Sequence, residues 1–187
     1  VELWNKAFEQ AGYQKAIEAL DFPKNDRYFD ADDIAYSCIR YVPSTSDKVS
    51  SSFLANPQTG EIINASVFVP ANVGNQIYRW LFLGSAASDA SMRTSHLPQD
   101  KFNQGLKYLV AREVGRSLGL LDNIGASYSY PVDSLRNGTF TRANNLAASI
   151  MANTPFNYVA QVGDKGVVYM PENVGQYDKH AIEWAYR

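Results

Sequence analysis

The sequence predicts an α+β fold, in which strands and long helices are followed by an irregular C-terminal part. Two segments, residues 34–42 and 61–69, are rich in β-branched and aromatic side chains, and a proline follows each of them. Residues 101–120 instead repeat apolar side chains at helical spacing. After Gly119 this periodicity ends, and Gly, Pro, Asn and Ser occur at many of the positions that follow.

Composition describes one ordinary folded domain over residues 1–187, with a net charge of −2, 19% charged residues and 45% hydrophobic residues. There is no run of Lys and Arg, so nothing predicts nucleic-acid binding. No apolar run approaches the roughly 18 residues that a membrane-spanning helix needs. A single cysteine, Cys38, excludes an internal disulfide. The chain opens without an initiator Met or a signal peptide, so we expect it to be part of a longer protein.

The first expected element is a helix over Leu3–Leu20, which places its apolar side chains near one face. An acidic stretch, residues 30–33, is expected to form a turn before the strand of residues 34–42. Pro43 ends that strand, because proline has no N–H to donate to a sheet. The polar residues 44–52 are expected to form a loop.

A second strand is expected after a turn at residues 56–60, which contain Asn, Pro and Gly. Residues 61–69 alternate and are rich in β-branched side chains, and Pro70 stops them. Residues 71–84 are expected to be helical, and the small and polar residues 85–99 are expected to form a loop before the helix already noted.

The C-terminal third has weaker signals. Residues 122–148 show little periodicity, so we expect irregular structure there. Ser149–Met151 is a tight apolar element, and residues 177–186 are expected to close the chain as a helix.

Residues 112–122 keep the outline of a zinc-binding helix. With His at positions 112, 116 and 122 they would read H-E-x-x-H-x-x-G-x-x-H, in which two imidazoles one helical turn apart hold zinc. The glutamate, here Glu113, would be the general base. The glycine, here Gly119, would let the chain turn so that a third ligand reaches the metal. The three ligand positions hold Arg112, Arg116 and Asp122 instead.

These substitutions argue against a zinc site. A guanidinium has N–H donors and no acceptor, so Arg112 and Arg116 cannot ligate zinc, and Asp122 alone is not a site. The chain has only two histidines, His96 and His180, and neither stands at motif spacing from another ligand. We expect His96 to lie in a solvated loop and His180 on the surface of a helix.

A family resemblance extends over nearly the whole chain. Together with the 112–122 frame, it rests on blocks at Trp4–Gly12, Asp32–Ser37, Asn56–Ile63, Pro131–Arg136, Ser149–Met151, Phe156–Gln161 and Tyr177–Trp184. These blocks resemble the metzincin-type zinc metallopeptidase domain of a bacterial family found in large, uncharacterised secreted or envelope proteins.

The resemblance implies a twisted mixed sheet and two long helices in an upper lobe, residues 1–121, and an irregular lower lobe, residues 122–187. It implies that Met151 is the methionine of the turn beneath the metal, and that active relatives contain zinc. It also implies a periplasmic, cell-envelope or secreted location in a bacterium.

We interpret the chain as a catalytically inactive pseudo-peptidase that needs no cofactor and serves as a binding or structural domain. In this hypothesis Arg112 and Arg116 fill the space of the metal, with Asp122 and Glu113 as their partners, and Glu113 is a vestigial general base. The alternatives are arginines that simply face water, a residual metal site that combines Asp122 with a histidine, and an active or residually active metallopeptidase that hydrolyses peptide bonds.

An extended peptide or protein segment is the expected partner class. Clefts of the resembled family hold substrate along the edge of the sheet, and a peptide can add to such an edge without a metal. We expect residues 61–69 to form that edge, while a covered groove would indicate a purely structural domain. The oligomeric state is left open. The expected binding residues are Glu61, Ile62, Ile63, Asn64 and Ala65.

Overall fold

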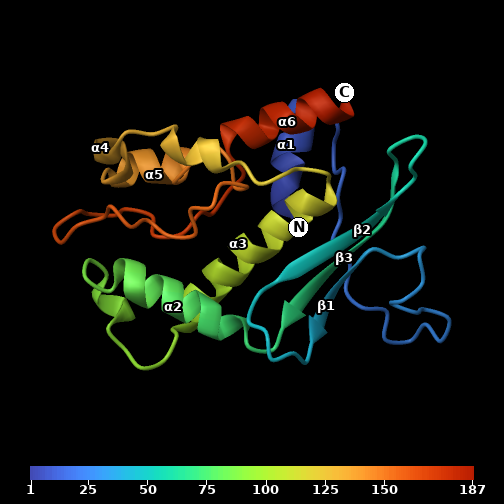
Figure 1. The fold of residues 1–187 in the computed structure, drawn as a ribbon, viewed down its shortest axis with the longest axis horizontal. Coiled ribbons are helices and arrows are strands. Elements are labelled where there is room, and N and C mark those ends of the chain that lie inside the picture. Colours follow the sequence, from blue (N-terminus) through green and yellow to red (C-terminus); the bar gives the residue numbers. More distant parts are fainter.

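A small mixed sheet forms one side of the molecule, which a computed structural model describes over residues 1–187 (Figure 1). The strands are β1 (Cys38–Val42), β2 (Ser50–Ala55) and β3 (Ile62–Pro70), and their order across the sheet is β1-β3-β2. β1 runs parallel to β3, and β2 runs antiparallel to it. This mixed sheet, with separate helices, confirms the predicted α+β fold.

Strand β2 is the element that the sequence prediction missed, because residues 44–52 were expected to form a loop. Its first residues are serines, which give no apolar alternation to recognise. The strand forms because β3 offers it a partner, in a register that places Ser51 opposite Val67 and Phe53 opposite Ala65. Pairing in the folded structure therefore decides the conformation of this segment.

The expectation that residues 61–69 form the edge of the sheet is wrong. β3 lies in the centre, with β2 on one side and β1 on the other. Of the proposed binding residues Glu61, Ile62, Ile63, Asn64 and Ala65, those within β3 have β2 on one side. On the other side, pairing with β1 begins only at Ser66. Before that point the Asn64 side chain donates to the carbonyl of Tyr36 (2.8 Å), and the Ala65 N–H donates to the Ser37 hydroxyl (3.1 Å). The outer strands of the sheet are β1 and β2.

The predicted N-terminal helix over residues 3–20 is too long. A 3₁₀ turn, η1 (Glu2–Trp4), leads into α1 (Asn5–Gln10), and the chain leaves this helix at Gly12, whose φ is +97°. Glycine reaches this left-handed conformation without a steric penalty, so it ends the helix. Residues 13–37 then form turns and extended chain without a helix or strand.

Helix α3 (Gln99–Ser117) crosses the middle of the molecule and packs against β2, β3 and helix α2 (Val73–Ser85) (Figure 1). Both helices lie within a few residues of their predicted positions. Between them the predicted loop contains one 3₁₀ turn, η2 (Ala90–Met92). None of the helices combines the length and the apolar character needed to cross a bilayer.

The C-terminal part is less irregular than its composition indicates, because asparagines cap short helices there. Its elements are η3 (Ile124–Tyr128), α4 (Val132–Leu135), α5 (Gly138–Asn144) and α6 (Gln176–Tyr186). The side chain of Asn137 accepts from the backbone N–H groups of Thr139 (2.9 Å) and Phe140 (3.1 Å) at the start of α5. Helix α6 packs on α1, so the first and last α-helices of the chain lie together near the end of α3 (Figure 1).

The core gathers around α3 at Gly115. A Cβ atom at this position would lie 2.5 Å from the ring of Trp4 and 2.6 Å from the sulfur of Met151, so only glycine fits. Trp4 and Met151 are both fully buried, and the Trp4 indole N–H donates to the carbonyl of Ala111 (2.8 Å). The N-terminal helix and the C-terminal lobe thus meet the central helix at a residue without a side chain.

We expect Gly115→Ala to destabilise the protein by about 1–3 kcal/mol, because the new methyl group overpacks a closed part of the core. Chemical denaturation measures this difference. Gly74→Ala in α2 is the matched control, since its Cβ would only touch Phe102 at 3.7 Å. Alanine is favoured over glycine in a helix, so the control should be neutral or more stable. Equal stabilities for the two variants would contradict the packing described.

Candidate functional site

The chain turns sharply at the end of α3, and this turn builds the site. Gly119 has a φ of +86°. Its N–H donates to the carbonyl of Arg116 (2.9 Å), and the N–H of Leu120 donates to the carbonyl of Gly115 (3.0 Å). These two bonds form a Schellman motif, which satisfies the last carbonyls of a helix and reverses the chain. The reversal brings Asp122 back beside the side chains of the last helical turns.

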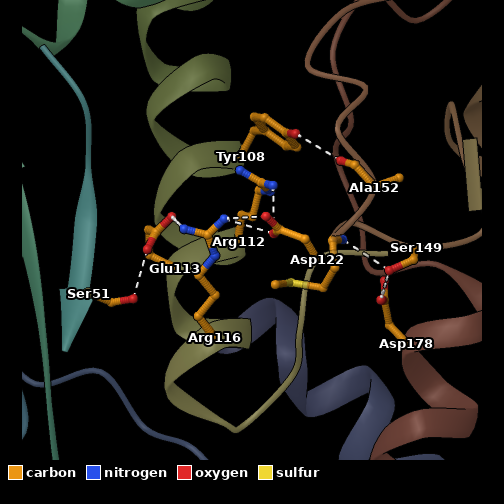
Figure 2. A network of polar contacts seen from close by, with 10 residues as sticks. Ser51, Tyr108, Arg112, Glu113, Arg116, Asp122, Ser149, Ala152 and Asp178 are labelled. Atoms are coloured by element: carbon orange, nitrogen blue, oxygen red, sulfur yellow. Dashed lines mark hydrogen bonds and ion pairs between the residues drawn. The ribbon is translucent and has the colours of Figure 1, made fainter. Parts of the chain in front are cut away.

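Asp122 accepts hydrogen bonds from both arginines of the motif frame (Figure 2). Nη2 of Arg112 lies 2.8 Å from its Oδ1, and Nη2 of Arg116 lies 2.8 Å from Oδ1 and 2.9 Å from Oδ2. Nη1 of Arg116 reaches in the other direction to Oε1 of Glu113 (3.2 Å). The guanidinium of Arg116 therefore bridges two carboxylates. We call Arg112, Glu113, Arg116 and Asp122 the ion cluster.

Glu113 joins the ion cluster to the sheet. It is buried, with 3% of its surface exposed, and its Oε2 accepts from the hydroxyl of Ser51 in β2 (2.7 Å). The contacts thus run without interruption from β2 through Glu113 and Arg116 to Asp122 beyond the helix (Figure 2). A buried carboxylate is tolerated only where it is paired and hydrogen-bonded, and Glu113 has both kinds of partner.

Charge balance stabilises the ion cluster, because two guanidiniums face two carboxylates. Burial acts to raise the pKa of Asp122, but the hydrogen bond from Arg116 and the charges of both arginines outweigh it and lower that pKa. The bond to Asp122 raises the pKa of Arg116 in turn. The Asp122 side chain is 45% exposed, so solvent screens these interactions and each pair contributes only about 1 kcal/mol or less.

A tight turn at Met151 lies beside the ion cluster. Its backbone is held by Asp178 of α6, which accepts from the Ser149 hydroxyl (2.5 Å), from the Ile150 N–H (2.7 Å) and from the Gly175 N–H (2.6 Å). The bond from Gly175 also caps the first turn of α6. Asp178 is fully buried, and burial raises its pKa against the lowering effect of these three donors.

Three contacts hold this turn against α3 and the segment after it. The sulfur of Met151 packs at Gly115, and the carbonyl of Met151 accepts from the Asn123 N–H (3.1 Å). The hydroxyl of Tyr108 reaches the carbonyl of Ala152 at 3.4 Å (Figure 2). Burial raises the pKa of Tyr108 to about 12, so this phenol stays protonated as a donor.

The donors present do not fit zinc. Arg112 and Arg116 have no lone pair to offer, and every oxygen of Glu113 and Asp122 already accepts a hydrogen bond from within the protein. No group of three or more His, Cys, Asp or Glu side chains is placed so that it could hold a metal ion. His96 lies exposed in a loop and His180 exposed on α6, as predicted for each.

The structure thus brings together the four residues of the motif frame that the sequence singled out. The contacts between the arginines and Asp122 exclude the alternative in which both arginines simply face water. Ser51 was missed, because the strand that carries it was not predicted. Ser149 and Asp178 were missed as a pair, although both fall in blocks that carried the family resemblance.

A comparison with known families gives a match over half of the chain. The model of a family described as Met-zincin matches residues 94–187, which include α3, the ion cluster, the Met151 turn and α6. No curated protein and no solved structure matches this sequence.

We expect Asp122→Asn to lower the free energy of unfolding by about 1 kcal/mol at neutral pH, because both arginines lose their shared carboxylate. The pKa of Asp122 is lowered from its usual value of 3.8, so its contribution is complete above that value and is lost as the pH falls through the folded-state pKa. Urea unfolding at neutral and acidic pH should therefore show a difference that shrinks in acid.

Asp21→Asn is the control, since Asp21 is an exposed aspartate away from the ion cluster. A difference for Asp122→Asn that stayed constant with pH, or that matched the control, would show that the ion cluster adds nothing to stability.

Proposed function

Because this chain belongs to the Met-zincin family, we propose that it is a pseudo-peptidase, a metallopeptidase-like domain in which an ion cluster replaces the zinc site. Its role would then be to bind another segment or to support a larger assembly. The bacterial, secreted or envelope location implied by the sequence resemblance stays a prediction.

One observation carries the proposal: the side chains at the three positions that would ligate zinc form ion pairs with one another. Arg112 and Arg116 both donate to Asp122, and the side chains of Arg112 and Asp122 are 14% and 45% exposed. The two guanidiniums are already paired with two carboxylates, so no excess negative charge remains to attract a metal ion. Hydrogen bonds within the chain form the turn at Gly119 and the Met151 turn beside the ion cluster.

Glu113 supports the same conclusion. It stands where active relatives carry the general base, but its carboxylate accepts from Ser51 and from Arg116. A general base must hold its free acceptor within reach of the water or group that it deprotonates. Here the carboxylate serves as a structural link between β2 and α3.

Peptide binding without cleavage is a second candidate, and the position of β2 favours it. β2 is an edge strand, antiparallel to β3, and Ser51 within it touches Glu113. An extended peptide can pair with such an edge through backbone hydrogen bonds alone. We therefore move the proposed peptide-binding strand from residues 61–65 to Ser50–Ala55.

We expect the unmodified protein, purified without chelator, to contain no stoichiometric zinc and to cleave no fluorogenic casein. The triple variant Arg112→His/Arg116→His/Asp122→His should bind zinc, because it restores three ligands on an unchanged scaffold. Elemental analysis and the cleavage assay measure both properties.

The control variant is Arg79→His/Arg187→His/Asp133→His. It introduces the same three histidines in place of two arginines and an aspartate, but at positions outside the 112–122 segment. Zinc and cleavage in the unmodified chain would overturn the proposal in favour of an active peptidase. Zinc binding by the control variant to the same extent would show that the frame at 112–122 has no special geometry.

For the second candidate, we expect a titration with an extended peptide to shift the amide resonances of Ser50–Ala55, with little change along residues 61–65. Two-dimensional NMR of the labelled protein measures this. The same peptide with N-methyl groups on its pairing edge should leave the spectrum unchanged. Shifts confined to other segments would exclude β2 as the binding strand.

A further inference from the structure

We propose a second binding surface, separate from the ion cluster: an apolar groove beside β1 that takes an extended peptide segment flanked by Lys and Arg. In this proposal the segment adds to the free edge of β1 as a fourth strand. Four features of the groove support it: its lining, the uncovered face of the sheet, the unpaired edge and the charge around it.

The groove has a volume of about 1550 Å³, and 23 of its 33 lining residues are hydrophobic. It lies between the sheet, the C-terminal end of α3 and residues 16–37, which precede β1, and its lining contains no residue of the ion cluster. A space of this size and character accepts apolar side chains rather than a small polar ligand. Its occupant must therefore carry several apolar groups.

Part of the sheet face in this groove is uncovered. Ile39 and Tyr41 of β1 stand opposite Val67 and Val69 of β3, so all four side chains lie on the same face. Val67 and Val69 are 3% and 7% exposed, whereas Ile39 and Tyr41 are 47% and 72% exposed. Helix α3 covers β2 and β3 on this face, and the apolar surface continues beyond it to β1.

The outer edge of β1 has no partner. β1 pairs with β3 alone, and no other segment makes a backbone hydrogen bond to Cys38–Tyr41. An unpaired edge next to an apolar face is the arrangement in which strand addition occurs, because the backbone supplies affinity and alternate side chains supply specificity. The favoured occupant is thus an extended segment with an apolar residue at every second position.

The charged side chains that line the groove indicate which residues should flank the apolar part of the bound segment. Four carboxylate side chains line the groove, at Glu18, Asp21, Asp26 and Glu61, and they lie exposed. The lining contains one guanidinium, Arg40, which is already paired with Asp32. A partner with Lys or Arg on either side of its apolar residues would match this surface, and an acidic partner would be repelled.

The test uses a fluorescein-labelled peptide in which Val and Thr alternate between pairs of Lys. We expect saturable binding to the full chain by fluorescence anisotropy. Replacing the Lys flanks by Glu should weaken binding roughly tenfold or more. N-methylation of the pairing edge should abolish binding, since it removes the backbone hydrogen bonds of strand addition while keeping the apolar side chains.

Variants locate the site. Ile39→Ser and Tyr41→Ser should each weaken binding, and Leu83→Ser, which removes an exposed leucine of α2 outside the groove, should not. These side chains are all exposed, so the variants should fold, and circular dichroism checks this. Asp21→Lys/Asp26→Lys should weaken binding of the basic peptide, whereas Asp100→Lys/Asp133→Lys, at exposed positions outside the groove, should not.

Four results would overturn the proposal. Equal binding of the N-methylated peptide would exclude strand addition, and equal binding of the Glu-flanked peptide would exclude the charge match. A concentration-dependent dimer, detected by sedimentation and abolished by Tyr41→Ser, would show that a second copy of the chain covers the groove instead. Binding that is lost in Arg116→Ala but kept in Ile39→Ser would place the peptide at β2, which supports the second candidate function and not this groove.

Discussion

The close packing at Gly115 is the constraint on which the other parts of the structure depend. Trp4 from the N-terminal helix and Met151 from the C-terminal lobe both reach α3 where it has no side chain. One face of the helix is thereby closed by the core. The neighbouring side chains of the same turns, Arg112 and Arg116, face the chain segment that returns after Gly119. The ion cluster therefore lies next to this packing point, where the Met151 turn and the returning segment both contact the helix.

The ion cluster joins the end of α3 to the segment that follows it and to the sheet. A metal ion in such a place holds a helix and a following segment together through its ligands. Here the carboxylate of Asp122 holds two guanidiniums, and Arg116 passes the connection on to Glu113 and to β2. These contacts join α3, the segment after Gly119 and β2 through side chains of the chain itself. Asp178, which fixes the Met151 turn from α6, makes its hydrogen bonds outside the ion cluster.

Much of this could be predicted from the sequence, and the failures have physical causes. The position of α3, the turn at Gly119 and the meeting of Arg112 and Arg116 with Asp122 follow from helical spacing and from a glycine at the helix end, which are local properties. The strand β2 was not predictable in this way, because its serines adopt an extended conformation only through their pairing with β3. Because the sequence did not predict β2, it also predicted the wrong position for β3. With only β1 as a known neighbour, β3 was expected at the edge of the sheet. The predicted length of the first helix was wrong for a different local reason. Apolar residues continue past Gly12, but the left-handed backbone conformation of that glycine ends the helix.

The reversal at Gly119 also limits how this segment can change in length. Asp122 meets both guanidiniums because a fixed number of residues separates it from the end of the helix. An insertion or deletion between Gly119 and Asp122 would turn the carboxylate away even if every residue of the ion cluster were kept. The ion cluster therefore depends on the spacing of this segment as well as on its residue types. Relatives that share the two arginines and the aspartate should align across it without gaps, whatever happens in the loops around them.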